Sequence, residues 1–265
     1  MAAPASTTAA AGASADGAQL TKTASLQATL PANLIFRQLF DRESCTYTYV
    51  LADATTKEGV LIDPVDTLVD RDVSILKEMG ISLQYGLNTH AHADHITGTH
   101  LLREHFPNMK SVLAKASGGK ADVLVADGDV ITVGSLALEV RATPGHTPGC
   151  VTYVLDEAMA FTGDALFVRG CGRTDFQGGS SKDLYTSIHS KLYSLPDNCL
   201  VYPGHDYKGR TVTTIGEEKA HNPRLHTGIS AEAFDKIMAE LGLPPPKKID
   251  ESVPANLRDG APASA

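Results

Sequence analysis

The stretch that decides the fold is Thr89-His90-Ala91-His92-Ala93-Asp94-His95, which directly follows a short predicted strand. It places three imidazoles and one carboxylate within six residues. Because side chains alternate along an extended chain, His90 and His92 point to the same side and can face one ion. Asp94 and His95 follow at the turn into the next predicted helix, where they can face the same cavity. Imidazole nitrogens and carboxylate oxygens bind catalytic divalent metals, so the string predicts a metal centre.

Three later segments place further ligand-type side chains beside glycine, after predicted strands. They are Thr143-Pro144-Gly145-His146-Thr147-Pro148-Gly149, Phe161-Thr162-Gly163-Asp164 and Tyr202-Pro203-Gly204-His205-Asp206. Small residues let the backbone approach a cavity closely, and proline stiffens the loop. Each segment alone is a weak signal, but together with the histidine string they form a strong one. The candidate ligands are His90, His92, Asp94, His95, His146, Asp164 and His205.

Composition excludes several classes of function. The chain has 265 residues, of which 42% are hydrophobic, enough for a sizeable core. Its 31 acidic and 23 basic residues give a net charge of -8, which argues against nucleic-acid binding. No window approaches the roughly 18 to 20 apolar residues of a membrane-spanning helix, so no membrane contact is expected. The four cysteines form no C-x-x-C pair, which fits a reducing compartment.

Periodicity and turn residues predict an α+β protein. Strands are expected over residues 46–51, 59–63, 85–89, 111–114, 150–155, 158–162 and 199–202, with several short ones between 123 and 140. Helices are expected over residues 66–79, 96–106, 181–195 and 231–241. Many strands with helices at intervals indicate two packed sheets with helices outside them.

The pattern of the ends predicts one catalytic domain, residues 32–250, between two flexible segments. Residues 1–31 are mostly Ala, Ser and Thr, which cannot bury enough surface to fold. This extension is poor in acids, as a mitochondrial targeting peptide is, but it contains no arginine. The expected location is therefore mitochondrial, or cytoplasmic if the extension is not a targeting peptide. Residues 251–265 read as a flexible C-terminal tail.

The order of the histidine string and the later G-H, G-D and G-H elements resembles the metallo-β-lactamase superfamily. The resemblance covers about Asn33 to Ala255. It implies an αββα sandwich with the metal site at one edge of the sheets. It fixes no reaction, because members of the superfamily hydrolyse several kinds of bond and some use dioxygen.

Three less general segments resemble the persulfide dioxygenases within that superfamily. They are Leu61-Ile62-Asp63-Pro64-Val65, Gly170-Cys171-Gly172-Arg173-Thr174-Asp175-Phe176-Gln177 and His221-Asn222-Pro223-Arg224-Leu225. The resemblance implies one Fe(II) per chain, held by the catalytic residues His90, His146 and Asp164, with three positions left for water, sulfur and O2. The implied reaction converts glutathione persulfide, O2 and water into glutathione and sulfite, a step of sulfide catabolism. The remaining candidate ligands, His92, Asp94, His95 and His205, would then orient the iron ligands and organise water.

The same residues also match all seven ligands of a dinuclear hydrolase, with zinc as the alternative metal. Under that hypothesis the chain resembles glyoxalase II, a thioesterase acting on S-lactoylglutathione. Glyoxalase II adds a helical C-terminal domain that supplies much of its glutathione site. Only about 60 residues follow His205 here, which favours the dioxygenase.

Two residues are candidates for contacting the glutathione part of the substrate. Arg173 is the first, because a guanidinium forks onto a carboxylate better than an ammonium does. The alternative for Arg173 is an ion pair with Asp175. Tyr207 is the second, weaker candidate. The expected partners are therefore glutathione persulfide and O2, and a homodimer is compatible with the sequence.

Overall fold

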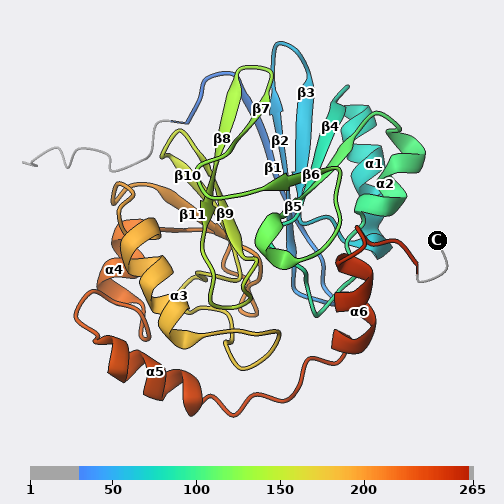
Figure 1. Cartoon of the computed structure of the whole chain (residues 1–265). Helices are drawn as coiled ribbons and strands as arrows, with labels where there is room; N and C mark the ends of the chain where they lie inside the picture. The colour runs from blue at the N-terminus through green and yellow to red at the C-terminus, as the bar shows by residue number, and fades with distance from the viewer. Residues whose placement is uncertain (1–29, 263–265) are drawn as a thin grey trace, which may run out of the picture.

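Two six-stranded sheets pack face to face with helices on their outer faces (Figure 1). The computed structural model describes residues 30–262, so the predicted extension lies, apart from its last two residues, outside the described residues. The two mixed sheets between helices confirm the predicted α+β class and the αββα sandwich. Among residues 30–262, no helix is both long and apolar enough to cross a membrane.

The first sheet comes from the first half of the chain, in the spatial order β1-β2-β3-β4-β5-β6. Its strands are β1 (Leu34–Phe40), β2 (Tyr47–Asp53), β3 (Glu58–Ile62), β4 (Ser82–Leu87), β5 (Lys110–Ala114) and β6 (Val123–Val125). Strands β1 to β3 pair antiparallel, and β3 to β6 pair parallel. Parallel neighbours need crossover connections. Helices α1 (Val69–Glu78) and α2 (Thr99–His105) lie in two of them.

The second sheet follows in the order β12-β11-β10-β9-β8-β7. Its strands are β7 (Val130–Val133), β8 (Leu136–Ala142), β9 (Val151–Leu155), β10 (Met159–Gly163), β11 (Leu200–Pro203) and β12 (Thr213–Thr214). Strands β10 and β11 are parallel, joined by α3 (Ser181–Ser187) and a π-helical turn (Ile188–Leu192). The short strands predicted between residues 123 and 140 therefore belong to two sheets, because the chain changes sheet after β6.

Three apolar clusters hold the layers together. The central one lies between the sheets and contains the stacked rings of Phe161 and Tyr202. On the first sheet, α1 buries Val69, Val73 and Leu76, which share one helix face by their spacing. On the second sheet, α3, α4 (Ile215–His221) and α5 (Ala231–Ala239) close the outer cluster. Helices α1, α2, α3 and α5 were predicted from the sequence, whereas α4 was not, although Thr214 and Glu217 form a capping box at its start.

Helix α6 (Ile249–Asn256) corrects the predicted flexible tail at residues 251–265. Ser252, Ala255 and Asn256 of this helix are buried, so the prediction is wrong for residues 251–256. The helix carries Pro254 in its interior, which removes a backbone donor and lowers helix propensity. Burial against the rest of the protein, rather than propensity, therefore stabilises it. Figure 1 places α6 beside the first sheet, on the opposite side of the molecule from α3 and α4.

Candidate metal centre

The candidate ligands converge at one edge of the two sheets. His90 and His92 belong to the histidine loop (residues 88–98), which follows β4 and contains no helix or strand. His146 follows β8, Asp164 follows β10 and His205 follows β11. The first sheet thus supplies the histidine loop, and the second sheet supplies the other three side chains.

Two groups of side chains are close enough to share an ion. The ligand atoms of His90, His146 and Asp164 lie within 4.8 Å of one another, and all three residues are buried. A second group, His92, Asp94 and His95, meets the same distance. All candidate ligands from the sequence therefore lie in one neighbourhood, with His205 Nε2 3.4 Å from Asp164 and 3.5 Å from Asp94.

Hydrogen bonds fix which nitrogen of His90 and His146 faces the site. Thr89 Oγ1 donates to Asp63 Oδ2 (2.8 Å), so towards His90 Nδ1, at 3.0 Å, it accepts. His146 Nδ1 lies 2.7 Å from the carbonyl oxygen of Arg173, which can only accept. Both Nδ1 atoms therefore carry a proton, so Nε2 is the atom that has the lone pair in the neutral form of each ring. A metal ligand needs that lone pair, and its orientation by the other nitrogen is the usual arrangement.

Three buried polar atoms of the site have no hydrogen-bond partner among the described residues. They are His92 Nδ1, His95 Nε2 and Asp164 Oδ1. In the two imidazoles, the other ring nitrogen does have a partner. His92 Nε2 contacts Asp63 at 3.1 Å, and His95 Nδ1 contacts Asp94 at 2.9 Å. Buried polar atoms are rarely left without a partner. The donor set and its unpartnered atoms fit a divalent metal.

Burial and neighbouring charge give the imidazoles different protonation behaviour. Burial, reinforced by His92 and His146, holds the pKa of His90 well below its ordinary value, so this ring is neutral. Burial also lowers the pKa of His205, but the carboxylates of Asp164 and Asp94 outweigh it and raise that pKa overall. Burial alone would raise the pKa of Asp94, but His205 and His95 outweigh it and bring that pKa well below its ordinary value. The Asp94 carboxylate therefore stays ionised.

Two glycines allow the site to close. Gly163, at φ 50°, directly precedes Asp164, and a side chain there would place its Cβ 2.5 Å from Thr89 Oγ1. Gly145, at φ 143°, precedes His146, and its Cβ would lie 2.3 Å from the backbone of Leu184 in α3. Both backbone conformations favour glycine. Glycine therefore brings β10 against the histidine loop and the His146 loop against α3.

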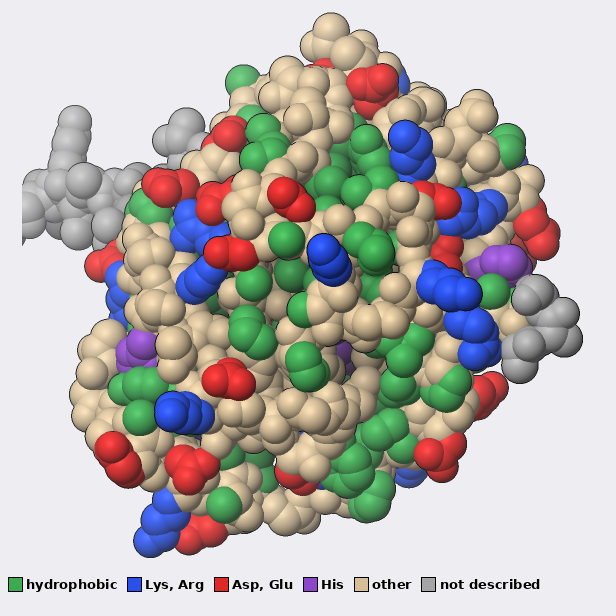
Figure 2. Space-filling model, viewed as in Figure 1, with side chains coloured by type: hydrophobic (Ala, Val, Ile, Leu, Met, Phe, Trp, Pro, Cys, Tyr) green, Lys and Arg blue, Asp and Glu red, His purple; other side chains and the backbone are tan. Residues whose placement is uncertain are grey.

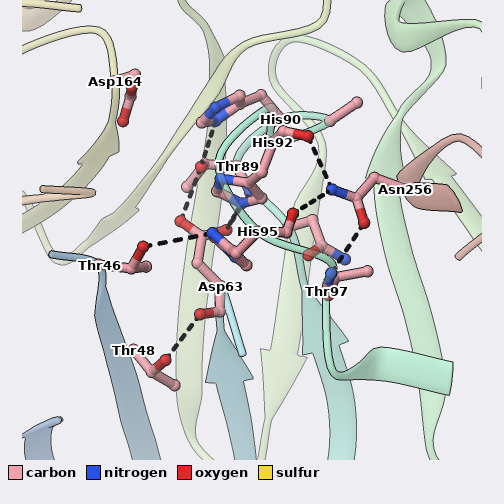
Figure 3. Close-up of polar contacts among 12 residues, drawn as sticks. Thr46, Thr48, Asp63, Thr89, His90, His92, His95, Thr97, Asp164 and Asn256 are labelled. Atoms are coloured by element: carbon pink, nitrogen blue, oxygen red, sulfur yellow. Dashed lines mark hydrogen bonds and ion pairs between the residues drawn. The ribbon is translucent and has the colours of Figure 1, made fainter. Parts of the chain in front are cut away.

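Several residues that hold the site were not identified as site residues from the sequence. Asp63, after β3, accepts hydrogen bonds from the backbone and hydroxyl of Thr89 and faces His92 (Figure 3). Burial raises the pKa of Asp63, but His92 and Thr89 lower it below the ordinary value. Thr46 lies 3.3 Å from both Asp94 and His95. Asp63 stood in a quoted motif, and an acid after an apolar strand was the available signal, whereas Thr46 offered none.

A cavity of about 490 Å³ opens beside the candidate ligands. Its wall includes His146, Asp164 and His205 together with the two predicted substrate residues, Arg173 and Tyr207. The volume lies within the range of about 300 to 1,000 Å³ usual for small-molecule sites. In the space-filling view, histidine atoms are recessed near the middle of the face between hydrophobic and other uncharged atoms, and acidic and basic side chains are scattered farther out (Figure 2).

The guanidinium of Arg173 makes four hydrogen bonds with other parts of the protein. It donates to both oxygens of Asp175 (2.6 and 2.7 Å) and to the carbonyls of Leu243 and Pro244. It also lies over the ring of Phe176, 4.4 Å from the centroid. This geometry matches the ion pair considered as the alternative for Arg173. Tyr207 is 70% exposed at the cavity wall.

The other basic residues of the cavity wall differ in whether they have a carboxylate partner. Arg169 pairs with Glu218, and Arg210 pairs with Asp206. Lys208 and Arg224 form no ion pair within residues 30–262, although both line the cavity. Arg224 makes one long contact, 3.4 Å to the carbonyl of Cys171. Free positive charge in the cavity therefore resides on these two side chains.

The chain is similar to proteins of known family. The Metallo-beta-lactamase superfamily profile matches residues 43–205. Persulfide dioxygenase ETHE1, mitochondrial, of Mus musculus is 55% identical over 237 residues, covering 89% of this chain and 92% of the mouse protein. The protein of the same name from Homo sapiens is 56% identical, covering 86% of this chain and 90% of its own length.

A solved structure agrees with these relatives. The crystal structure of ETHE1 from Myxococcus xanthus is 52% identical, with a TM-score of 0.82, and the match covers 86% of this chain and all of that one. The residues matched by the superfamily profile, 43–205, include every candidate ligand. The chain therefore belongs to the metallo-β-lactamase superfamily and, within it, to the persulfide dioxygenases.

Proposed function

We propose that this chain oxidises glutathione persulfide at a single iron(II) held by His90, His146 and Asp164. Membership of the persulfide dioxygenases makes the chain an oxidoreductase that acts on a persulfide with dioxygen. In the balanced reaction, one persulfide, one O2 and one water give one glutathione, one sulfite and two protons. The S–S bond breaks, and the outer sulfur gives four electrons to dioxygen and gains three oxygen atoms.

The observation that carries the proposal is the group of two imidazoles and one carboxylate within 4.8 Å, next to a cavity of substrate size. Two histidines and one carboxylate on one face are the ligand set of many non-haem iron oxygenases. When bound, iron(II) supplies redox chemistry with dioxygen and open coordination positions. The chain's own contribution is to aim two Nε2 lone pairs and one carboxylate oxygen at the same point.

The polar residues around this group have a positioning role in the proposal. Asp63 orients His92 directly and His90 through Thr89. His205 Nε2 lies between the carboxylates of Asp94 and Asp164, 3.5 Å from the first and 3.4 Å from the second. These side chains exclude bulk water from the buried ligands and hold the carboxylate of Asp164 in place.

We assign the binding of the substrate carboxylates to Arg224 and Lys208, which face the cavity without an ion-pair partner among the described residues. A guanidinium bonded to a carboxylate makes a strong, charge-assisted contact. Arg173 shapes the cavity instead, by joining Asp175 to the backbone of Leu243 and Pro244. Tyr207, stacked at 6.0 Å on His205, offers its exposed face to the peptide part of the substrate.

A dinuclear thioesterase of the glyoxalase II type is the second candidate function. The group His92, Asp94 and His95 favours it, because its ligand atoms are as close together as those of the first group. Under this hypothesis two zinc ions would occupy the centre, and S-lactoylglutathione would be hydrolysed. The persulfide dioxygenase relatives favour the first candidate.

Metal content and substrate turnover separate the two functions. The chain is purified and its metals are measured by elemental analysis, and oxygen uptake is followed with glutathione persulfide. We expect about one iron per chain and sulfite formed in equal amount to the oxygen consumed. Two zinc ions per chain, with rapid hydrolysis of S-lactoylglutathione and no oxygen uptake, would overturn the proposal.

We also propose that residues 1–31 direct the chain to mitochondria. The mouse and human relatives carry the word mitochondrial in their names, and the segment is rich in Ser and Thr and poor in acids. Fusion of residues 1–31 to a fluorescent protein tests this. Mitochondrial fluorescence is expected, and diffuse cytoplasmic fluorescence would contradict the proposal.

A further inference from the structure

The structure points to Asn256 of α6 as a positioning residue that holds the histidine loop in its ligand-bearing shape; we propose that it sets the affinity of the metal centre. Asn256 lies more than 150 residues after that loop in the sequence and is 4% exposed. It is not a candidate ligand, because its side chain contacts the backbone of the loop (Figure 3).

All three side-chain hydrogen bonds of Asn256 go to the histidine loop. Its Nδ2 donates to the carbonyl oxygens of His92 (2.9 Å) and His95 (2.8 Å), and its Oδ1 accepts from the backbone N–H of Thr97 (2.8 Å). An amide nitrogen has two N–H groups and its oxygen accepts, so one side chain satisfies three backbone groups in one plane. No other standard side chain of this size offers two donors and an acceptor.

The two carbonyls depend on this side chain. Within residues 30–262, no other donor is found for the carbonyl oxygens of His92 and His95. The histidine loop has no strand ladder or helix to satisfy its backbone, and buried backbone groups need partners. Loss of Asn256 would therefore free the segment between His92 and His95 to change its backbone conformation.

The segment from His92 to His95 contains the three side chains of the second candidate ligand group. A rotation of the peptide after His92 would move the ring of His92, which packs against the ring of His90 with the centroids 4.0 Å apart and the planes inclined at 49°. A rotation near His95 would move Asp94, whose carboxylate contacts His205. Removal of a group that orients a metal ligand without touching the metal commonly weakens metal binding by about 10- to 100-fold. Asn256 acts on the ligands through the backbone rather than through a ring nitrogen.

Helix α6 is itself fixed to the body of the protein, so it can serve as a rigid support. The carbonyl of Leu257 accepts from Lys120 N–H (2.9 Å), and Asp259 pairs with Arg103 (2.5 Å). At the other end of the helix, Lys248 pairs with Glu43 (2.8 Å). These contacts do not involve the histidine loop, so α6 should stay in place when Asn256 is replaced.

The chain offers matched variants for a test. Asn256→Asp keeps the size and the acceptor for Thr97 but replaces both donors by oxygen. Asn256→Ala removes all three bonds without adding charge. Ser252→Ala removes a buried hydroxyl of the same helix that has no partner in the described residues. Ala255→Gly lowers the helix propensity next to Asn256 and leaves its side chain intact.

Cobalt(II) is the probe, with its dissociation constant measured by chelator competition and its absorption spectrum recorded. Melting temperatures of the metal-free proteins are measured in parallel. We expect both Asn256 variants to bind cobalt about 10- to 100-fold more weakly with an altered spectrum. Ser252→Ala and Ala255→Gly should retain the affinity and spectrum of the unaltered chain, even if Ala255→Gly melts earlier. Asn256→Ala serves as the test if Asn256→Asp does not fold.

The inference rests on the metal centre of the proposed function, and the experiment separates the two. Absence of cobalt binding by the unaltered chain would count against the metal centre itself. Binding by the unaltered chain together with wild-type affinity in both Asn256 variants would overturn only the role of Asn256. An equal loss of affinity in Ala255→Gly at a similar melting temperature would also overturn it, because it would reduce the effect to general stability.

Discussion

Asp164 is the one carboxylate in the group that includes His90 and His146. Its Oδ2 lies 3.5 Å from His146 Nε2, and its Oδ1 is buried without a hydrogen-bond partner in the described part of the chain. We expect Asp164→Ala to lose iron and oxygen uptake together, because the change removes the only anionic ligand.

Iron per chain, measured by elemental analysis, checks this prediction. Asp94→Ala is the matched control, since it removes a carboxylate of the second group only, and it should keep most of the iron. Full iron occupancy in Asp164→Ala would show that another carboxylate completes the centre.

Arg224 and Arg173 line the same cavity but have different surroundings. Arg224 is free of carboxylates within residues 30–262, so Arg224→Gln should raise KM for glutathione persulfide and leave kcat and the melting temperature nearly unchanged. Loss of a charge-assisted bond of about 1.5 to 3 kcal/mol corresponds to roughly 10- to 150-fold in kcat/KM.

Arg173→Gln provides the comparison for Arg224→Gln. Because Arg173 joins Asp175 to Leu243 and Pro244, its replacement should lower the melting temperature. Steady-state kinetics and thermal melts of both variants decide the assignment. If KM rose in Arg173→Gln and not in Arg224→Gln, Arg173 rather than Arg224 would contact the substrate.

Helix α1 contains a buried acid that makes its stability depend on pH. Asp72 is fully buried, its Oδ2 has no partner among the described residues, and burial raises its pKa to about 6 in spite of Arg71. The unfolded chain has the lower value of 3.8, so the folded state binds the proton more tightly. Folding therefore loses stability as pH rises from about 4 to 6, and the cost is complete above pH 6.

Asp72→Asn should remove that cost, because an amide does not ionise. The free energy of unfolding of the variant relative to the parent should shift in its favour by up to about 3 kcal/mol between pH 4 and pH 8. Urea titrations of the metal-free proteins at several pH values measure the shift. The exposed Asp70→Asn on the same helix is the control, and equal pH profiles of the two variants would contradict the prediction.

The elements that could be predicted from the sequence are those with strong local signals. Helix α1 has its apolar side chains at helical spacing, and β10 begins with the apolar run Met159–Phe161 and ends at Gly163, directly before Asp164. Helix α6 could not be predicted, because Pro254 contradicts the helix locally and only burial stabilises it. The candidate ligands were identifiable because they cluster in short motifs. Asn256 was not, because nothing local relates an amide in a tail to backbone carbonyls in a distant loop.

The two sheets of the whole molecule meet at the candidate metal centre. His90 comes from the first sheet, and His146 and Asp164 come from the second, so a bound ion would link the two layers. A ligand that binds only the folded state stabilises it, by about 2.7 kcal/mol at a hundred times its dissociation constant.

Removal of the metal by a chelator should therefore leave the sandwich folded, because the apolar cluster between the sheets remains. We expect the melting temperature to fall by about 5 to 10 °C in a domain of this size. Calorimetry of the loaded and stripped protein, with circular dichroism to verify the fold, checks this. Identical melting curves would indicate that the ion does not bridge the layers.

The order in which the ligand side chains occur along the chain also matters during synthesis. The histidine loop leaves the ribosome before His146, Asp164 and His205 have been translated, and Asn256 is added later than all of them. A nascent chain therefore exposes the histidine loop before the facing side chains of the second sheet have been added, so the full set of candidate ligands can assemble only after His205 has been translated. A premature stop between residues 206 and 255 would yield a chain that has every candidate ligand but lacks the amide that holds the histidine loop.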